Sequence, residues 1–171
     1  MSDSPHHSAR LELAGTDRLD EVRELWLALH RHHRQVVGSL PLVDDDAASW
    51  SRRRELYRNR MRAGRGFLVL ASLDHKIVGY AFVCVEDGPD DTFPVGARYA
   101  EVYSLSVAAR ARGRGIGTEL LDFVDRELAR IGIVDVKIAV MVGNEAARRL
   151  YERRGFSAAE TVMWSFGSGA A

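Results

Sequence analysis

The sequence has few cysteines and prolines and no long hydrophobic run, and each shortage excludes a class of protein. Of 171 residues, one is cysteine and four are proline. Cys84 cannot form a disulfide within the chain and lies in the apolar run from Ile77 to Val85, so we expect a buried thiol and a reducing, cytoplasmic setting. Met1 to Arg10 is polar, and no segment has the length of a membrane span. We therefore predict a soluble chain with neither signal peptide nor membrane anchor.

An excess of charge of one sign is also missing. The chain has 24 basic and 24 acidic residues, so no overall field would attract it to nucleic acid or to an anionic membrane. With 46% hydrophobic residues, it is long enough for one core and too short for two ordinary domains. We predict a disordered N-terminus over residues 1–8, one domain over 9–166 and a frayed tail over 167–171.

Hydrophobic spacing predicts alternating strands and helices. Apolar residues recur at helical spacing in Asp17 to His33, after Asp44 to Asp46, from Ile116 to Gly132, and after Asn144. Strands are expected at residues 11–13, 67–71, 76–85, 99–107, 134–142 and 156–166, with a hairpin at residues 73–75. In the strand 99–107 the odd positions should share one face. Strands around two late helices, together with hairpins, predict an α/β fold with a mixed sheet.

A glycine-rich stretch separates the strand 99–107 from the third helix and is typical of phosphate binding. It consists of Arg112, Gly113, Arg114, Gly115, Ile116, Gly117 and Thr118. Glycines allow backbone conformations that bring successive N–H groups to one anion, and the following helix directs its positive dipole end to the same place. The P-loop pattern fails because no lysine precedes Thr118. A dinucleotide-binding oxidoreductase stays an alternative: Asp135 fits its ribose-binding acid, but Thr118 replaces its third glycine.

The pattern Arg112-x-x-Gly115-x-Gly117 resembles the loop that holds the coenzyme A pyrophosphate in the GNAT N-acetyltransferase superfamily. A second stretch, Asn144-x-x-Ala147-x-x-x-Tyr151-x-x-x-Gly155-Phe156, is similar to another signature of that family. The resemblance spans Phe67 to Phe156. It implies a twisted mixed sheet, flanked by helices and splayed between the strand that ends at Val107 and the strand 134–142, where the pantetheine arm of acetyl-CoA would insert.

The resemblance also implies roles for individual residues. The backbone of Leu105, Ser106 and Val107 would pair with pantetheine, and one of these N–H groups could stabilise an oxyanion. Asn144 would cap the fourth helix, contact the cofactor, or do both. Together with residues 112–118, Ala147 and Tyr151, these residues form the expected acetyl-CoA site.

Two side chains are candidates for proton transfer. Glu101 lies among apolar and aromatic neighbours that would raise the pKa of its carboxyl group, as a general base requires. The alternative is an ion pair with Arg98 or another arginine. Tyr151 matches the tyrosine that, in the family, hydrogen-bonds the departing sulfur. Its alternative is a core aromatic residue at helical spacing from Ala147.

Other polar clusters are ambiguous. Among His30, His32 and His33, the first and last are a plausible same-face pair on a helix, but this pair lacks a third ligand at convincing spacing, so we expect no metal. Two acidic stretches, Asp44 to Asp46 and Asp87 to Asp91, together with Trp50, could belong to the acceptor pocket or could be a helix cap and a soluble turn.

These observations predict an acetyl-CoA-dependent N-acetyltransferase, with acetyl-CoA as cosubstrate and no metal cofactor. A primary amine in a protein, peptide or small molecule would attack the thioester directly. The alternative is a non-catalytic acyl-CoA-binding or sensing module. The sequence leaves the acceptor and the acyl chain length open and allows a homodimer.

Overall fold

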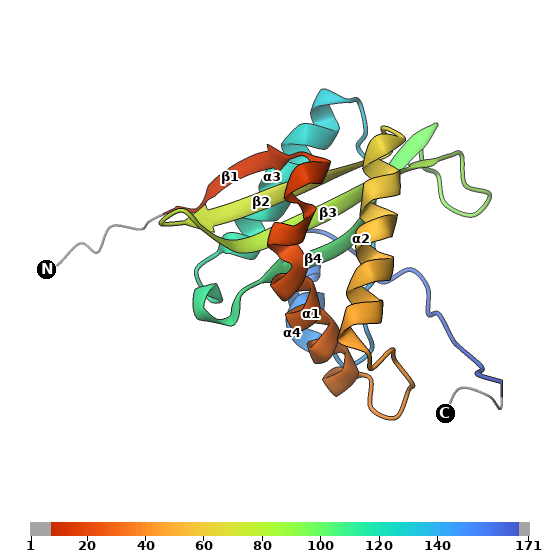
Figure 1. Cartoon of the computed structure of the whole chain (residues 1–171). Coiled ribbons are helices and arrows are strands. Elements are labelled where there is room, and N and C mark those ends of the chain that lie inside the picture. The colour runs from red at the N-terminus through yellow and green to blue at the C-terminus, as the bar shows by residue number, and fades with distance from the viewer. Residues whose placement is uncertain (1–7, 168–171) are drawn as a thin grey trace, which may run out of the picture.

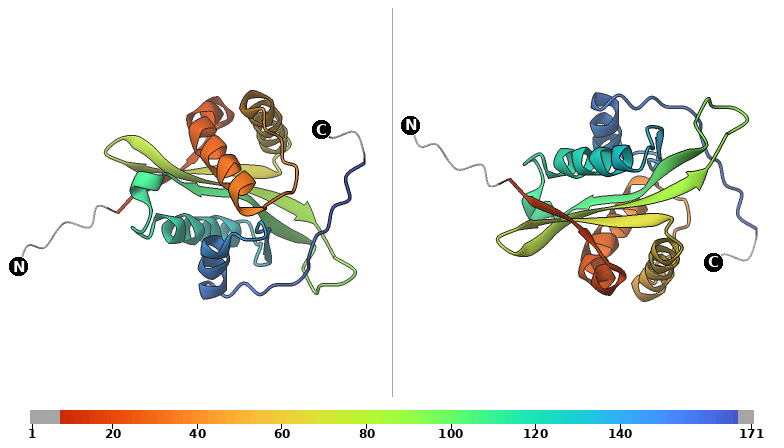
Figure 2. Two further views of the ribbon diagram at one scale, coloured as in Figure 1. Left: turned by 90° about the horizontal axis from the view of Figure 1, so that it is seen from below. Right: turned by 90° about the horizontal axis from the view of Figure 1, so that it is seen from above.

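The computed structural model describes residues 8–167, in which a five-stranded sheet lies between two layers of helices (Figures 1 and 2). The strand order is β1-β2-β3-β4-β5; β1 to β4 are antiparallel, and β5 is parallel to β4. The strands are β1 (Arg10–Ala14), β2 (Gly66–Leu73), β3 (Lys76–Asp87), β4 (Arg98–Val107) and β5 (Val136–Ile138). The helices are α1 (Arg23–Val36), α2 (Asp46–Arg62), α3 (Ile116–Arg130) and α4 (Glu145–Arg153), with 3₁₀ helices η1 (Thr16–Val22) and η2 (Ala109–Ala111). This architecture confirms the predicted mixed α/β fold.

The hairpin between β2 and β3 forms where the sequence predicts it. Its two turn residues, Asp74 and His75, both have positive φ angles, 48° and 60°. Two such residues in a row match the right-handed twist of the flanking strands, which favours a tight hairpin. The long, continuous pairing of β2 with β3 follows from this turn.

Each face of the sheet has its own core. Figure 2 shows α1 and α2 on one face and α3 and α4 on the other. On the α1/α2 face, Trp26 and Tyr57 pack with Phe82 and Cys84 of β3. On the α3/α4 face the apolar side of α3 packs against the central strands of the sheet. The α3 side chains in this contact are those of Ile116, Leu120, Leu121, Val124 and Leu128. The helical spacing of these side chains confirms the sequence-based prediction for α3.

The predicted first helix is in fact two elements. Residues 16–22 form a 3₁₀ helix, and the α-helix begins at Arg23 and continues to Val36. A 3₁₀ helix has three residues per turn, so Leu19 and Val22 lie one above the other on the same side. Both side chains are fully buried, which explains the tighter winding.

The predictions for the last two strands are wrong. The expected strand 134–142 is reduced to β5, because it pairs with β4 only from Ala100 to Val102. The expected strand 156–166 does not form within the described residues. A strand needs a paired neighbour to satisfy its backbone groups, and this segment pairs with none of the described strands. In Figure 1 the segment extends away from the body of the protein toward the C-terminus.

The predictions for residues 1–7 and 168–171 lie outside the described residues. Ser8 is described, and its Oγ donates a hydrogen bond to Glu119 Oε1 at 3.2 Å. None of the helices among residues 8–167 combines the length and the apolar character that a transmembrane span requires.

Candidate active site

The loop before α3 has an unusual backbone. Gly113 and Gly115 have φ angles of 74° and 81°, in the left-handed region that favours glycine. A Cβ atom at either position would meet nothing within 4 Å, so the space above the loop is open. Among the described residues, the N–H groups of residues 113–118 donate no hydrogen bond, and the first to bond back is that of Glu119, to Gly115 O. A set of free N–H groups at a helix N-terminus can bind an anion.

Arg112 and Gly117 of this loop make structural contacts with β4 and α4. Arg112 Nε donates to Val107 O at 3.1 Å, which ties the loop to the end of β4. Gly117 lies against α4: a Cβ atom there would be 3.4 Å from Leu150 Cδ2. The absence of a side chain at Gly117 therefore lets α3 and α4 pack closely, while its N–H still points along the helix axis toward the loop.

β4 and β5 separate beside this loop. Their pairing ends at Val102 and Ile138, whereas β4 continues to Val107 with β3 as its remaining partner. Backbone groups of residues 103–107 on the β5 side thus have no strand to bond. This opening is where a second extended molecule could pair with β4, as in β-strand addition.

A bulge in β4 changes which face of the sheet its side chains lie on, compared with the alternation that the sequence predicts. The register with β3 shifts between Phe82 and Val83, so that Tyr103 is inserted into the strand. Before the bulge, Glu101 lies opposite Cys84 on the α1/α2 face. After it, Leu105 and Val107 pack with the core on the α3/α4 face. Glu101 and Leu105 therefore face opposite sides of the sheet, contrary to the prediction that they share one.

Ser106 also lies on the α1/α2 face. Its buried Oγ donates to Leu25 O at 3.0 Å. Its side chain is therefore occupied in holding α1 against β4, and only its backbone could contact a ligand in the opening.

Glu101 lies half-buried at the edge of the opening. Burial raises the pKa of its carboxyl group, the nearby Lys137 ammonium lowers it, and the negative charge of Glu86 raises it again. The alternative partner, Arg98, instead donates from Nη2 to Ile131 O at 2.9 Å. Glu101 is thus a carboxylate with a raised pKa beside an opening, which are the properties of a general base.

A polar network next to Glu101 was missed by sequence reasoning. Tyr103 donates its hydroxyl proton to Glu86 Oε1 at 3.1 Å, and Arg60 Nη2 donates to the same hydroxyl at 3.2 Å. Arg60 also forms an ion pair with Glu86 at 3.0 Å. Burial raises the pKa of Tyr103 to about 12. The bulge places Tyr103 on this face, and no local sequence pattern signals a bulge here.

Tyr151 lies on the opposite face, in the core formed with α3. Its ring meets Phe156 edge to face, with the centroids 5.9 Å apart. Burial alone raises the pKa of Tyr151 to about 12, so the phenol stays protonated at neutral pH. A protonated phenol keeps its proton available as a hydrogen-bond donor.

Asn144 begins α4 as predicted. Its Oδ1 accepts a hydrogen bond from the N–H of Ala147 at 3.3 Å, which is an N-cap. The loop before it contacts the other layer of helices, since a Cβ atom at Gly143 would lie 2.4 Å from Val36 O at the end of α1. Elements from both faces therefore meet at this end of the molecule.

The histidines lie in separate environments. His30 stacks on Trp26 with centroids 5.5 Å apart, and its Nε2 is 2.7 Å from Val43 O. Burial, reinforced by neighbouring positive charges, lowers the pKa of His33 to about 4. No cluster of three potential ligands from His, Cys, Asp and Glu occurs within residues 8–167.

The side chains of the two acidic stretches cap a helix, form ion pairs and accept backbone hydrogen bonds. Asp45 caps α2 through the N–H groups of Ala47 and Ala48, and Asp46 pairs with Arg31 and Arg34. In the second stretch, Asp87 pairs with Arg65, while Asp90 Oδ1 accepts from the N–H groups of Thr92 and Phe93. Trp50 is buried in the α1/α2 core. These contacts fit the structural alternative for both stretches.

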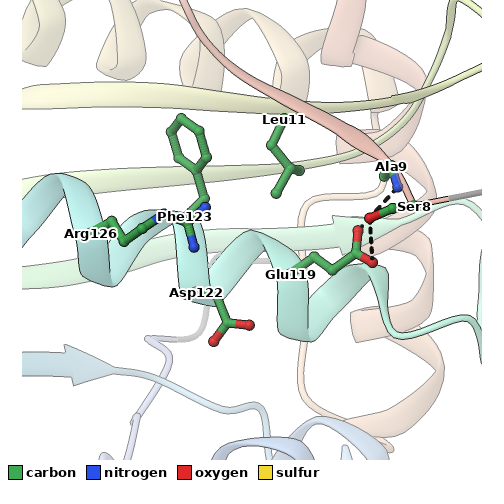
Figure 3. A pocket seen from close by; sticks show the side chains of 7 residues that line it. All are labelled: Ser8, Ala9, Leu11, Glu119, Asp122, Phe123 and Arg126. Carbon is green, nitrogen blue, oxygen red and sulfur yellow. Dashed lines mark hydrogen bonds between the residues drawn. The ribbon is translucent and has the colours of Figure 1, made fainter.

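A surface hollow lies between β1 and the outer side of α3, away from the opening. Figure 3 shows Leu11 and Phe123 on its inner side and Glu119 hydrogen-bonded to Ser8 and Ala9 at one end. Glu119 is bonded to Ser8 and Ala9, and Asp122 Oδ1 accepts from Arg154 Nη1 at 2.7 Å, so both carboxylates that line the hollow already have partners.

Residues 19–156 match the acetyltransferase (GNAT) family, and the chain belongs to it. A mycothiol acetyltransferase from Propionibacterium freudenreichii is 29% identical over 94% of this chain and 48% of its own length. The chain spans about half the length of the curated relatives it matches first.

Solved structures show the same fold. A GCN5-related N-acetyltransferase from Ralstonia eutropha has a TM-score of 0.76 at 21% identity, over 92% of this chain and 98% of that one. A predicted acetyltransferase from Clostridium acetobutylicum, solved with acetyl-CoA, has a TM-score of 0.69 at 16% identity, over 92% and 96% of the two chains. The open sheet, antiparallel apart from β4 and β5, is not the parallel sheet of a dinucleotide-binding oxidoreductase, so that alternative is wrong.

Proposed function

We propose that the protein transfers an acetyl group from acetyl-CoA to a primary amine by direct attack, as a cytoplasmic enzyme. The observation that carries this proposal is the separation of β4 from β5 beside a loop whose N–H groups are free. A long molecule with an anionic end and an extended amide-containing arm fits both features. Coenzyme A has this chemistry, and membership of the GNAT family supports it.

In this proposal the pyrophosphate binds the N–H groups of residues 113–118, and the side chains of Arg112 and Arg114 add positive charge. The pantetheine arm pairs with the backbone of Leu105, Ser106 and Val107. Asn144 and Ala147 line the opening from the start of α4. The fit rests on the free N–H groups and the unpaired side of β4.

The two faces of the sheet then contribute to different steps of the acetyl transfer. Glu101 takes a proton from the incoming ammonium on the α1/α2 face, directly or through water, so that the amine nitrogen can form a bond to the acyl carbon. As the carbon–sulfur bond breaks, Tyr151 donates a hydrogen bond to the sulfur from the α3/α4 face. Phenol and thiol differ by about 1.5 pKa units in water, where full proton transfer costs roughly 2 kcal/mol. Burial raises the pKa of Tyr151 further, which favours donation of a hydrogen bond over transfer of the proton.

A base matters most for a lysine-like acceptor. An ammonium with a pKa of about 10.4 is neutral in roughly one molecule in 2,500 at pH 7, whereas an α-amine near 7.8 is neutral in about one in seven. The mycothiol acetyltransferase relatives suggest a small molecule as the acceptor to try first. Peptide N-termini, lysine peptides and polyamines form the rest of the panel.

The test is release of free thiol from acetyl-CoA in the presence of each amine, with mass spectrometry of the acceptor. We expect one acceptor to gain 42 Da and an equal amount of coenzyme A to appear, since the transfer adds C₂H₂O. Tight binding of acetyl-CoA without turnover of any amine would contradict catalysis and favour an acyl-CoA-sensing module.

A further inference from the structure

Arg53 of α2 is a partly buried cation that has no anionic partner among the described residues. Its neighbour Arg54 pairs with Asp20, and Arg60, further along the helix, pairs with Glu86. Within the described part of the chain, Arg53 forms no ion pair and donates no hydrogen bond. Because a charge that is removed from water is costly unless it is paired, Arg53 is suited to an anion from outside the chain.

Two aromatic rings fix the position of the Arg53 guanidinium. Its Cζ atom lies 4.0 Å from the centroid of the Trp26 ring and 5.6 Å from that of Tyr57. Both rings are buried. Trp26 Nε1 donates to Ser49 Oγ at 3.3 Å, and the Tyr57 hydroxyl donates to Ser104 Oγ at 2.6 Å. Stacking uses the flat face of a guanidinium, so its N–H edge stays available to an anion.

α2 carries Arg53 toward the side of the sheet where β4 and β5 separate. Late in the helix, Arg60 lies over β2, since a Cβ atom at Gly66 would be 3.0 Å from Arg60 Cβ. Tyr57 then reaches Ser104 of β4. Arg53 comes one turn earlier, about 6 Å further along the helix axis in the same direction. Figure 1 shows α2 crossing the strands, with its first half beyond β4.

Glu101 lies on the same face of the sheet and also has no direct partner. It is opposite Cys84 in the register of β3 with β4. Burial raises the pKa of the Cys84 thiol to about 12; the charges of nearby arginines, Arg53 among them, lower it, and that of Glu101 raises it. Both groups are therefore close to one thiol. Among the described residues Glu101 forms no ion pair, because its neighbour Lys137 pairs with Glu160.

His33 lies near Arg53 but adds no second positive charge. Burial, followed by the positive charges around it, lowers the pKa of His33 to about 4, so the ring is neutral at neutral pH. One turn later, Val36 O contacts Gly143 in the loop before α4. This part of the α1/α2 layer is thus next to elements of the candidate coenzyme A site. It offers one unpaired cation, Arg53, and one unpaired carboxylate, Glu101.

We propose that the acceptor is an amine that also carries a carboxylate, as an amino acid does, with the carboxylate on Arg53 and the ammonium at Glu101. This inference rests on the proposed acetyl transfer and names the acceptor class for it. The two parallel N–H groups of a guanidinium match the two oxygens of a carboxylate. A molecule with one charge of each sign leaves both side chains paired. A phosphate would bring further negative charge that neutral His33 does not balance.

The test compares carboxylate-bearing amines with their own carboxamides as acceptors. The panel is the standard L-amino acids, β-alanine and γ-aminobutyrate, each beside its amide, with kcat/KM measured for the parent and for variants. For the best carboxylate acceptor, Arg53→Gln should lower kcat/KM at least about tenfold, mostly through KM, because a charge-assisted pair is lost. For the matching amide it should change kcat/KM less than about twofold, since an uncharged amide forms no such pair.

Two further variants make the comparison specific. Arg52→Gln removes the same charge from an exposed neighbouring position and should leave kcat/KM for acid and amide unchanged. Arg53→Lys keeps the charge but not the forked N–H groups, so its kcat/KM for the acid should fall between those of the parent and Arg53→Gln. Equal losses on acid and amide in Arg53→Gln would overturn the inference and leave the acetyl transfer in place. A higher, Arg53-dependent kcat/KM for phosphoethanolamine than for every amino acid would also overturn it.

Binding gives a second measurement that needs no turnover. The same acceptors are titrated calorimetrically into protein saturated with coenzyme A. A carboxylate-bearing amine should bind the parent, and at least about tenfold more weakly Arg53→Gln. Such binding without acetylation would contradict the proposed transfer but confirm the site for carboxylate-bearing amines. Neither binding nor acetylation of any carboxylate-bearing amine, or acetylation only of amines that lack a carboxylate, would overturn the inference.

Discussion

Strands β2 and β3 bond to a neighbour on each side along most of their length, whereas β5 bonds only to β4, through three residues. The first region, β2 and β3, satisfies its backbone groups within the sheet and buries side chains on both faces. The second, around β5, leaves N–H and C=O groups of β4, of β5 and of the loop before α3 without backbone partners among residues 8–167. Since unsatisfied backbone groups are costly unless water or a ligand takes them, the second region is where ligands and partners are expected to bind.

The comparison predicts that the largest loss of activity comes from a residue at the border of the two regions. Glu101→Gln should lower turnover by about 100- to 10,000-fold near neutral pH, the range for one general base. Burial raises the pKa of Glu101, and a base works only when deprotonated, so parent activity should rise as pH increases through that pKa. The variant should recover at higher pH, where the amine deprotonates unaided.

The measurement is a pH profile of kcat/KM for parent and variant. Glu152→Gln is the control, because this carboxylate pairs with Arg148 on the exposed side of α4. A loss that is the same at every pH would assign Glu101 to positioning the amine. Full activity at neutral pH would remove Glu101 from the mechanism.

A smaller loss of activity is expected from a substitution at Tyr151, on the α3/α4 face of the sheet. Tyr151→Phe should lower kcat by about 10- to 1,000-fold, the range for one positioned donor or acid. The ring and its edge contact with Phe156 stay, so acetyl-CoA should raise the melting temperature as much as in the parent. Thermal shift and steady-state kinetics on the same preparation give both numbers. Unchanged kcat would leave Tyr151 as a core aromatic.

Replacement of a valine by alanine should lower the free energy of unfolding much more in the first region than in the second. Val83→Ala removes two buried methyl groups from β3 and should cost about 1.5–3 kcal/mol of unfolding free energy. Val142→Ala, after β5, alters an exposed side chain and should change it by less than about 0.5 kcal/mol. Urea denaturation at low protein concentration measures both. Equal costs would mean that residues after β5 are as well packed as the central strands.

Local patterns were enough to predict β2, β3 and the starts of α2, α3 and α4, but not the start of α1 at Arg23. The Asp74-His75 turn, the apolar stripe of α3 and the cap at Asn144 each depend on residues close together in sequence. The bulge at Tyr103 depends on the register between β3 and β4, which alternation alone does not reveal. The predicted strand at residues 156–166 has the right composition but pairs with none of the strands among residues 8–167. Strand propensity alone therefore does not decide whether a segment joins the sheet.

The loop before α3 offers the most direct test of the central claim, that the free N–H groups there and the opening beside β4 bind acetyl-CoA. Gly113 and Gly115 resemble Gly64 and Gly132 in having φ angles of 66° to 81° and no atom within 4 Å of an added Cβ. Two double variants, Gly113→Ala with Gly115→Ala and Gly64→Ala with Gly132→Ala, therefore impose the same backbone strain, about 1–2 kcal/mol per residue.

Calorimetric titration with acetyl-CoA should detect binding to the parent. The dissociation constant should rise at least about tenfold in the loop variant, because the strained backbone no longer holds its N–H groups around one anion, and less than about twofold in the control. No binding to the parent, or equal weakening in both variants, would contradict the claim.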